Sequence, residues 1–148
     1  MRISAKGRYG LSAMIYLAQN SETTECISVL KVSEFLGVSK IYLEQVFALL
    51  KKADLVVSIK GSSGGYQLSR SSDHITSFEI LNAIEVTLFE ATENALSDSA
   101  SYINTTLESM LWSKLDEKVK GFLNTVTLSD LVTESSKNQN GIEYMYFL

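Results

Sequence analysis

The stretch "LVVSIKGSSGGYQLSR", residues 55–70, predicts a β-hairpin. Leu55, Val57 and Ile59 occupy alternate positions before the glycines, and the alternation resumes at Tyr66 after them. Period-two alternation on both sides of a Gly/Ser connection is typical of two antiparallel strands with one buried face. The glycines permit a positive φ at the tip and let a second backbone approach closely. The stretch fits either an ordinary solvated turn or a basic tip that contacts an anion.

Length and composition limit the class of protein. A chain of 148 residues forms one domain, or a small domain with an appendage. With 45% hydrophobic and 20% charged residues it is a folded protein rather than a disordered one. One cysteine, Cys26, excludes an intrachain disulfide and is typical of a reducing compartment. No apolar run reaches the roughly 18 residues that span a bilayer, so we expect a cytoplasmic protein without membrane contact.

Charge is divided unequally along the chain. Residues 1–70 hold nine Lys/Arg and five Asp/Glu, a net charge of +4. Residues 71–148 hold four and twelve, a net charge of −8, within the overall −4. The division suits a module that binds a polyanion, followed by a region with another role. A chance imbalance would look the same. We divide the chain into a DNA-binding domain at 1–75 and a helical dimerisation and regulatory region with a C-terminal tail at 76–148.

Three helices are predicted before the hairpin, over about 8–19, 28–36 and 39–53. Gly37 supplies the turn after the second helix, and Ser39 is the expected N-cap of the third. Helix, helix, tight turn, helix and two-stranded wing is the order of a winged helix-turn-helix. Spacing assigns the buried faces as Val29, Leu30, Val32, Phe35 and Leu36 on the second helix and Leu43, Val46, Phe47 and Leu50 on the third.

The second half of the chain is predicted to be helical. "TSFE", residues 76–79, is a capping box that starts a helix ending at about 86. After a polar loop, a long helix follows over about 100–124, and one last short helix starts at Thr127 and Asp130. The tail "KNQNGIEYMYFL" becomes apolar at its end. The fold class is therefore mainly α with a small β-hairpin: a winged helix-turn-helix and a long dimerisation helix.

The long helix is the expected dimer interface. A helix of about 25 residues is longer than this small core can cover, and twofold dimers are the commonest oligomers. Two recognition helices related by a twofold axis also read a palindrome with half-sites about one turn apart. The predicted contact residues are Ile103, Leu107, Met110, Leu111, Leu115, Val119 and Phe122.

The face of the third helix opposite its buried stripe carries groups that read bases. Gln45 can pair with adenine, Ile41 can touch a thymine methyl and Glu44 can accept from cytosine. Lysines on this helix and at the hairpin tip suit phosphates and a narrow minor groove. A solvated helix face is the alternative. The predicted DNA-binding residues are Lys6, Arg8, Ser39, Lys40, Ile41, Tyr42, Glu44, Gln45, Lys52, Lys60, Ser62, Ser63 and Tyr66.

Several motifs together resemble one family. "MRISAKGRYGL", "VSKIYLEQVF", "LVVSIKGSSGGYQLSR" and "GFLNTVTLSDL" are similar to the Rrf-two (Rrf2) family of bacterial winged-helix regulators. The resemblance covers nearly the whole chain. It implies a homodimer joined through the long helix on a palindromic operator. It places base reading at Ile41, Tyr42, Glu44 and Gln45 and a wing contact at Lys60.

Within the family, "LWSKL", "FLNTVTLSDL" and "GIEYMYFL" are most similar to the cysteine-metabolism repressor branch. That resemblance implies cysteine synthase as a partner, docked through the C-terminal tail; the alternative is a tail that packs on its own dimer. Another branch holds a [2Fe–2S] cluster through three cysteines before the long helix. Residues 88–109 contain neither Cys nor His, so we expect no cluster, metal or other cofactor.

The remaining reactive residues suggest regulation rather than catalysis. Cys26, in the loop before the second helix, is either an oxidation switch or an inert small hydrophobe. His74 is expected to be an ordinary surface or partly buried histidine. One His, one Cys and no phosphate-binding loop leave no catalytic constellation, so we expect no enzyme. The predicted function is a sequence-specific transcription regulator, a repressor; the alternative is a winged helix that docks another protein.

Overall fold

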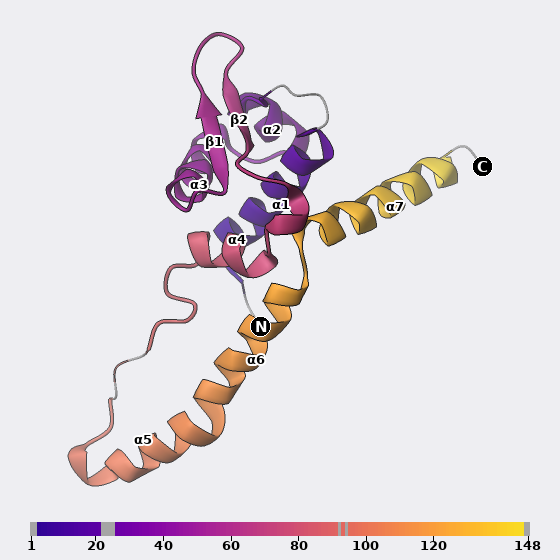
Figure 1. Cartoon of the computed structure of the whole chain (residues 1–148). Helices are drawn as coiled ribbons and strands as arrows, with labels where there is room; N and C mark the ends of the chain where they lie inside the picture. Colours follow the sequence, from indigo (N-terminus) through magenta and orange to yellow (C-terminus); the bar gives the residue numbers. More distant parts are fainter. Residues whose placement is uncertain (1–2, 22–25, 92, 94, 147–148) are drawn as a thin grey trace.

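The computed structural model describes residues 3–21, 26–91, 93 and 95–146. Helices and a two-stranded antiparallel sheet form a body, from which a long helical arm and a last helix run in different directions (Figure 1). The body contains α1 (Ala5–Gln19), α2 (Val29–Leu36), α3 (Lys40–Lys52), β1 (Val56–Ile59), β2 (Gly65–Leu68) and α4 (Ser77–Ile84). The arm consists of α5 (Ser101–Leu107), the π-helical turn η4 (Glu108–Trp112) and α6 (Ser113–Thr125), and α7 (Leu128–Tyr146) follows. This arrangement confirms the predicted fold class.

Side-chain caps determine where the first helices begin. The Ser4 hydroxyl accepts a hydrogen bond from the Gly7 N–H, so α1 begins three residues earlier than predicted. Ser28 caps α2 in the same way, and Gly37, with φ 67°, is the C-cap after Leu36. Ser39 occupies the N-cap position of α3 but its side chain makes no capping hydrogen bond. Ser39 is thus the N-cap by position, as predicted.

The core forms where α3 packs against α1 and α4. The predicted stripe of α3 is fully buried, as expected from its helical spacing. The prediction for α2 is wrong in part, because Leu30 and Phe35 are 51% and 63% exposed. Phe35 stacks from outside on the Tyr16 ring, with 4.3 Å between ring centroids. The central side chains of the core are Met14, Leu17, Val32, Leu43, Val46, Phe47, Leu50, Leu55, Val56, Ile75, Ile80 and Leu128.

The hairpin is antiparallel, and Tyr66 and Leu68 of β2 pack against the core as predicted, but the buried face of β1 is shifted by one residue from the prediction. Val56 pairs with Leu68 and is buried, whereas Val57 and Ile59 are exposed. The reason lies in Leu55, which is buried before the strand begins and donates its N–H to the Leu50 carbonyl. Leu55 and Val56 are thus both buried, and the alternation of buried and exposed residues starts at Val56.

A short segment before α2 pairs with β2 of the hairpin through an isolated antiparallel bridge. Ile27 and Tyr66 exchange two backbone hydrogen bonds of 2.9 and 2.8 Å. A Cβ on Gly65 would lie 2.2 Å from the Ile27 carbonyl oxygen, so glycine is needed for this approach. At the tip, Gly61 has φ 118°. Both roles predicted for the glycines, close approach and positive φ, are therefore confirmed.

Helix α4 begins with the predicted capping box. The Glu79 N–H donates to Thr76 Oγ1, and the Thr76 N–H donates to Glu79 Oε2 at 2.9 Å. The helix ends at Ile84, short of the predicted end, where the following Glu85 accepts a hydrogen bond of 2.9 Å from the Ser4 N–H. The contacts of α4 with α1 and α3 join it to the body.

The arm and α7 differ in detail from the predicted helices. A π-helical turn, which the apolar spacing does not reveal, interrupts the arm between α5 and α6. Thr127 and Asp130 start α7 by reciprocal hydrogen bonds, as expected. However, α7 has 19 residues and is not short. With no proline to end it, the helix continues through the polar part of the tail as far as Tyr146.

Among the residues that the structure describes, no helix has the length and apolar character needed to cross a membrane. No group of three or more His, Cys, Asp and Glu in the same ranges could hold a metal ion.

Candidate DNA-binding surface

The outer face of α3 presents the side chains predicted to read bases. Ile41 is 69% exposed, and Glu44, Gln45 and Lys52 are exposed on the same helix. Lys40 Nζ lies 3.7 Å from Glu44 Oε1, so the carboxylate has a cationic partner in the free protein. Both partners are about half exposed, and such a pair contributes little to stability. Moving the Glu44 carboxylate from Lys40 to a base would therefore cost little free energy.

Tyr42 has a different environment from its neighbours on α3. Its half-buried ring meets the Tyr9 ring edge-on, with 5.5 Å between centroids. Lys6 Nζ lies 5.9 Å from the Tyr42 centroid. The ring thus joins α3 to α1 and holds a lysine beside α3. Arg8, also on α1, is exposed.

The wing presents three of the predicted residues at its tip. Lys60, Ser62 and Ser63 are exposed in the connection between β1 and β2. Tyr66 is placed otherwise, because its ring stacks on the buried Phe47 with 4.6 Å between centroids and 16° between planes. The ring of Tyr66 thus has a packing role, and its contact with DNA stays a prediction. Tyr66 anchors the wing to α3, a long-range contact that local spacing does not reveal.

Two further residues near the wing gain partners that the sequence does not show. The Cys26 thiol donates a hydrogen bond to the Ser63 carbonyl, with 3.1 Å between Sγ and the oxygen. Arg70, at the end of the wing sequence, pairs with Glu79 and donates to the His74 carbonyl. Of the two cations that bracket the glycines, Lys60 is exposed at the tip, whereas Arg70 is half-buried and bonded to residues of the body.

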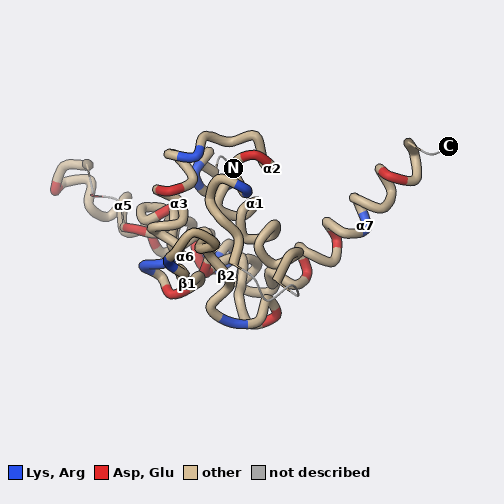
Figure 2. The backbone as a smooth tube through the Cα atoms, turned by 90° about the horizontal axis from the view of Figure 1, so that it is seen from above, with Lys and Arg blue, Asp and Glu red and all other residues tan. Residues whose placement is uncertain are grey.

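Charge on the body is mixed in sign. Figure 2 shows Lys and Arg spread over the body with Asp and Glu among them, rather than gathered in one continuous patch. His74 is exposed, as expected, and its Nδ1 lies 3.9 Å from Asp73 Oδ1. The Ser71 hydroxyl, which donates to Asp73, holds the pKa of that carboxyl below its usual value. The candidate surface is thus defined by α3 and the wing tip.

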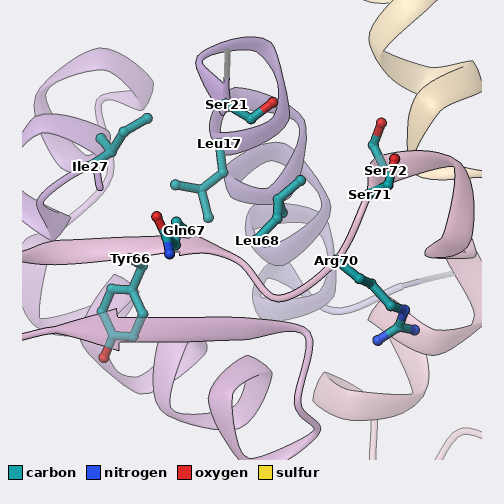
Figure 3. A pocket seen from close by; sticks show the side chains of 9 residues that line it. All are labelled: Leu17, Ser21, Ile27, Tyr66, Gln67, Leu68, Arg70, Ser71 and Ser72. Atoms are coloured by element: carbon teal, nitrogen blue, oxygen red, sulfur yellow. The ribbon is translucent and has the colours of Figure 1, made fainter. Parts of the chain in front are cut away.

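A cavity of about 310 Å³ lies behind the wing, between the end of α1, β2 and residues 70–72 (Figure 3). Figure 3 shows Leu17 and Leu68 directed into the space between α1 and β2. The Arg70 side chain points away from them. Arg70 nevertheless lines the cavity together with Ser71 and Ser72.

An exposed helix after a tight turn, with a two-stranded wing packed beside it, defines a winged-helix DNA-binding protein. The chain belongs to the Rrf2 family, described as iron-dependent transcriptional regulators, whose model matches residues 3–134. It is a DNA-binding transcription regulator, and its relatives are regulators rather than enzymes.

Individual relatives support this assignment. The chain is 38% identical to the HTH-type transcriptional regulator IscR of Klebsiella pneumoniae (strain 342), over 89% of this chain and 80% of that protein. It is similar to the structure of CymR (YrzC), the global cysteine regulator of B. subtilis, with TM-score 0.72 and 32% identity, covering 90% of this chain and 98% of that one. It is also similar to the oxidized form of Staphylococcus aureus CymR, with TM-score 0.68 and 32% identity over 89% and 96% of the two chains.

The residues present do not fit an iron–sulfur cluster, despite the description of the family. The chain has one cysteine, Cys26, and its thiol faces the wing. A cluster needs several thiolate or imidazole ligands, and the described residues bring no such set together.

Proposed function

We propose that this regulator binds a palindromic operator as a homodimer joined through the arm, with one α3 and one wing on each half-site. The observation that carries the proposal is the apolar stripe of the arm. Six of the seven predicted dimer residues are between 37% and 66% exposed, and Val119 is half-buried. The six are Ile103, Leu107, Met110, Leu111, Leu115 and Phe122.

A second copy is the occupant that best fits this stripe. Contiguous exposed apolar surface on a folded protein marks an interface, and one face of an arm can pair with the same face of a second copy under a twofold axis. Such a dimer would hold two recognition helices in a fixed relation, which suits a palindrome. The arm extends away from the body, so pairing of two arms leaves α3 and the wing free (Figure 1).

Within each half-site, three exposed side chains of α3 and the half-buried Tyr42 would read bases. Gln45 offers a bidentate amide, Glu44 an acceptor and Ile41 an apolar group. Lys60 would enter the minor groove from the wing tip. The exposed or half-exposed side chains of Lys6, Arg8, Ser39, Lys40, Lys52, Ser62 and Ser63 would contact the backbone.

The genes controlled are proposed to serve cysteine or sulfur metabolism, with the bound dimer acting as a repressor. Support comes from the tail motifs, which resemble the cysteine-metabolism repressor branch, and from the likeness to the global cysteine regulator of B. subtilis. Cys26 is the proposed oxidation switch. Its contact with the wing and the oxidized form recorded for the S. aureus relative support that role.

The C-terminal tail is the proposed docking segment for cysteine synthase. Helix α7 projects away from the body, and Ile142, Tyr144 and Met145 near its end are exposed (Figure 1). The terminal carboxylate, on Leu148, lies outside the described residues. A pull-down with cysteine synthase, using the full chain and a chain ending at Gly141, tests this partner.

Selection from random duplexes tests the main proposal. The purified chain is incubated with the library at moderate salt, and retained sequences are read after several rounds. The dimer predicts enrichment of one palindrome with half-sites about one helical turn apart. Sedimentation of the free protein should give twice the chain mass. An asymmetric half-site, or a monomer that binds as tightly as any larger species, would overturn the proposal.

A further inference from the structure

Arg70 connects three parts of the body through its guanidinium. Nε donates to the His74 carbonyl oxygen at 2.9 Å, and one terminal nitrogen lies 3.4 Å from the Asp54 carbonyl oxygen. The other terminal nitrogen forms an ion pair with Glu79 Oε1. These partners lie in the turn after α3, the 3₁₀ turn η2 (Ser72–His74) and α4. A planar fork with donors in fixed directions can serve all three, whereas an ammonium group cannot.

The contact with Asp54 falls on a strained turn. Asp54 has φ 57°, in the left-handed region that non-glycine residues seldom adopt. Its carbonyl also accepts a hydrogen bond of 2.6 Å from the Ser69 hydroxyl. Two residues that follow β2 therefore hold the connection between α3 and β1. Because α3 carries the recognition face and β1 leads to the wing tip, this turn sets the angle between them.

The network continues from Glu79 to the arm. Glu79 Oε2 accepts from the Thr76 N–H at 2.9 Å, and Thr76 Oγ1 donates to Asn124 Oδ1 at 3.2 Å. Asn124 Nδ2 donates to the Lys120 carbonyl at 3.0 Å, which leaves its Oδ1 as the acceptor. An antiparallel bridge between Thr76 and Thr127 reinforces the same junction. Polar contacts thus run from the end of α3 to α6.

We infer that Arg70 is a positioning residue for DNA binding, which fixes the recognition helix and the wing relative to each other and, through Glu79, Thr76 and Asn124, to the arm. The inference rests on the proposed function, since a fixed relation to the arm sets the distance between the two half-sites of a dimer. Arg70 acts through these contacts rather than on a phosphate, because its charge is already paired with Glu79.

The substitution Arg70→Lys distinguishes a positioning role from a phosphate contact. It keeps the positive charge and removes the planar guanidinium that bonds to three partners. Binding is measured on the selected palindrome over a range of salt, and on palindromes with one base pair added or removed at the centre. We expect a loss of about tenfold on the selected site, as for a misaligned base contact, with the slope of log K against log salt unchanged. Discrimination against altered spacing should fall.

Asn124→Ala tests the link to the arm without touching Arg70. Affinity for an isolated half-site should stay unchanged, while discrimination against altered spacing falls. Asn82→Ala, on the exposed side of α4, is the matched control and should change neither quantity. Thermal melting of each variant shows whether the fold is kept, and a loss of spacing discrimination at unchanged half-site affinity is not produced by simple destabilisation.

Hydrogen exchange of the free protein gives a readout independent of DNA. Arg70→Lys should accelerate exchange in the turn after α3 and in the wing, and unchanged exchange would overturn the inference. Full affinity for Arg70→Lys, together with a salt slope lower by about one for Arg70→Gln, would make Arg70 a phosphate contact and overturn it too. If the wild type tolerates any spacing, the proposed palindrome fails, and the exchange experiment still decides the positioning role.

Discussion

Cys26 Sγ lies 3.1 Å from the carbonyl oxygen of Ser63, so the thiol in the segment before α2 touches the tip of the wing. The next residue, Ile27, continues the contact by pairing with Tyr66. Peroxide converts a thiol to a sulfenic acid and water, adding an oxygen atom at the sulfur. The added oxygen changes this contact, because the donor to the Ser63 carbonyl is then no longer the S–H. We therefore expect oxidation of Cys26 to weaken DNA binding through the wing.

Fluorescence anisotropy on the selected operator checks this expectation. Peroxide should lower the affinity of the wild type, and a thiol reductant should restore it. Cys26→Ser should bind the operator as the untreated wild type does, because a hydroxyl can donate to the same carbonyl, and should be insensitive to peroxide. Equal sensitivity of Cys26→Ser and the wild type would remove Cys26 as the switch.

Gln45 is predicted to carry specificity rather than general affinity. Its amide is exposed on α3, opposite the buried stripe. Gln45→Ala should cost about 1–3 kcal/mol on the operator and little on a random duplex, because a bidentate base contact is lost and no charge is removed. Competition titration with both duplexes measures the difference. An equal loss on both would place Gln45 away from the bases.

Lys60 is predicted to act in the opposite way. It is exposed at the wing tip and carries the charge that would enter the minor groove. Lys60→Ala should weaken binding to all sequences and lower the salt slope by about one. Lys137→Ala, a lysine exposed on α7, is the control and should leave the slope unchanged. If both variants leave the slope unchanged, the wing tip does not meet the phosphates.

The arm can be tested by placing a charge in its apolar stripe. Leu115 is exposed in the single chain and would be buried between two copies. Leu115→Glu should give a monomer, because burying an unpaired carboxylate costs several kcal/mol. Operator affinity should fall with it. Ser109→Glu adds the same charge on the arm outside the stripe and should stay dimeric. Analytical ultracentrifugation separates the outcomes, and a dimeric Leu115→Glu would exclude this interface.

Sequence patterns predicted those features that depend on residues close to one another in the chain, such as helix faces and caps. The buried stripe of α3 was predictable because apolar residues recur with 3.6-residue spacing along its 13 residues, so only one face of the helix can be buried. The capping box of Thr76 and Glu79 was predictable because its two hydrogen bonds join residues three apart. The exposed residues of α3 that we propose read bases follow directly from the stripe, because they lie on the other side of the same helix.

Contacts between distant residues could not be predicted in this way. The bond from Cys26 to Ser63 and the stack of Phe47 on Tyr66 depend on how the segment before α2 and the hairpin dock on α3. The predicted buried face of β1 was wrong because Leu55 is buried before the strand begins, where the alternation of a strand does not apply. The length of α7 was missed because its distal half is exposed, so no apolar periodicity marks it.

Gly65 is the position where the wing tolerates no side chain. A Cβ there would lie 2.2 Å from the Ile27 carbonyl oxygen and 2.7 Å from the Ser28 nitrogen, both backbone atoms that cannot rotate away. Gly65→Ala should therefore lower the free energy of unfolding by about 1–3 kcal/mol, as overpacking does, and separate the Ile27 edge from β2. Gly121→Ala is the control, because a Cβ on Gly121 meets no atom within 4 Å and alanine favours a helix. Urea denaturation of both variants gives the comparison, and equal stability of Gly65→Ala and the wild type would show that the edge pairing between Ile27 and Tyr66 contributes nothing to the fold.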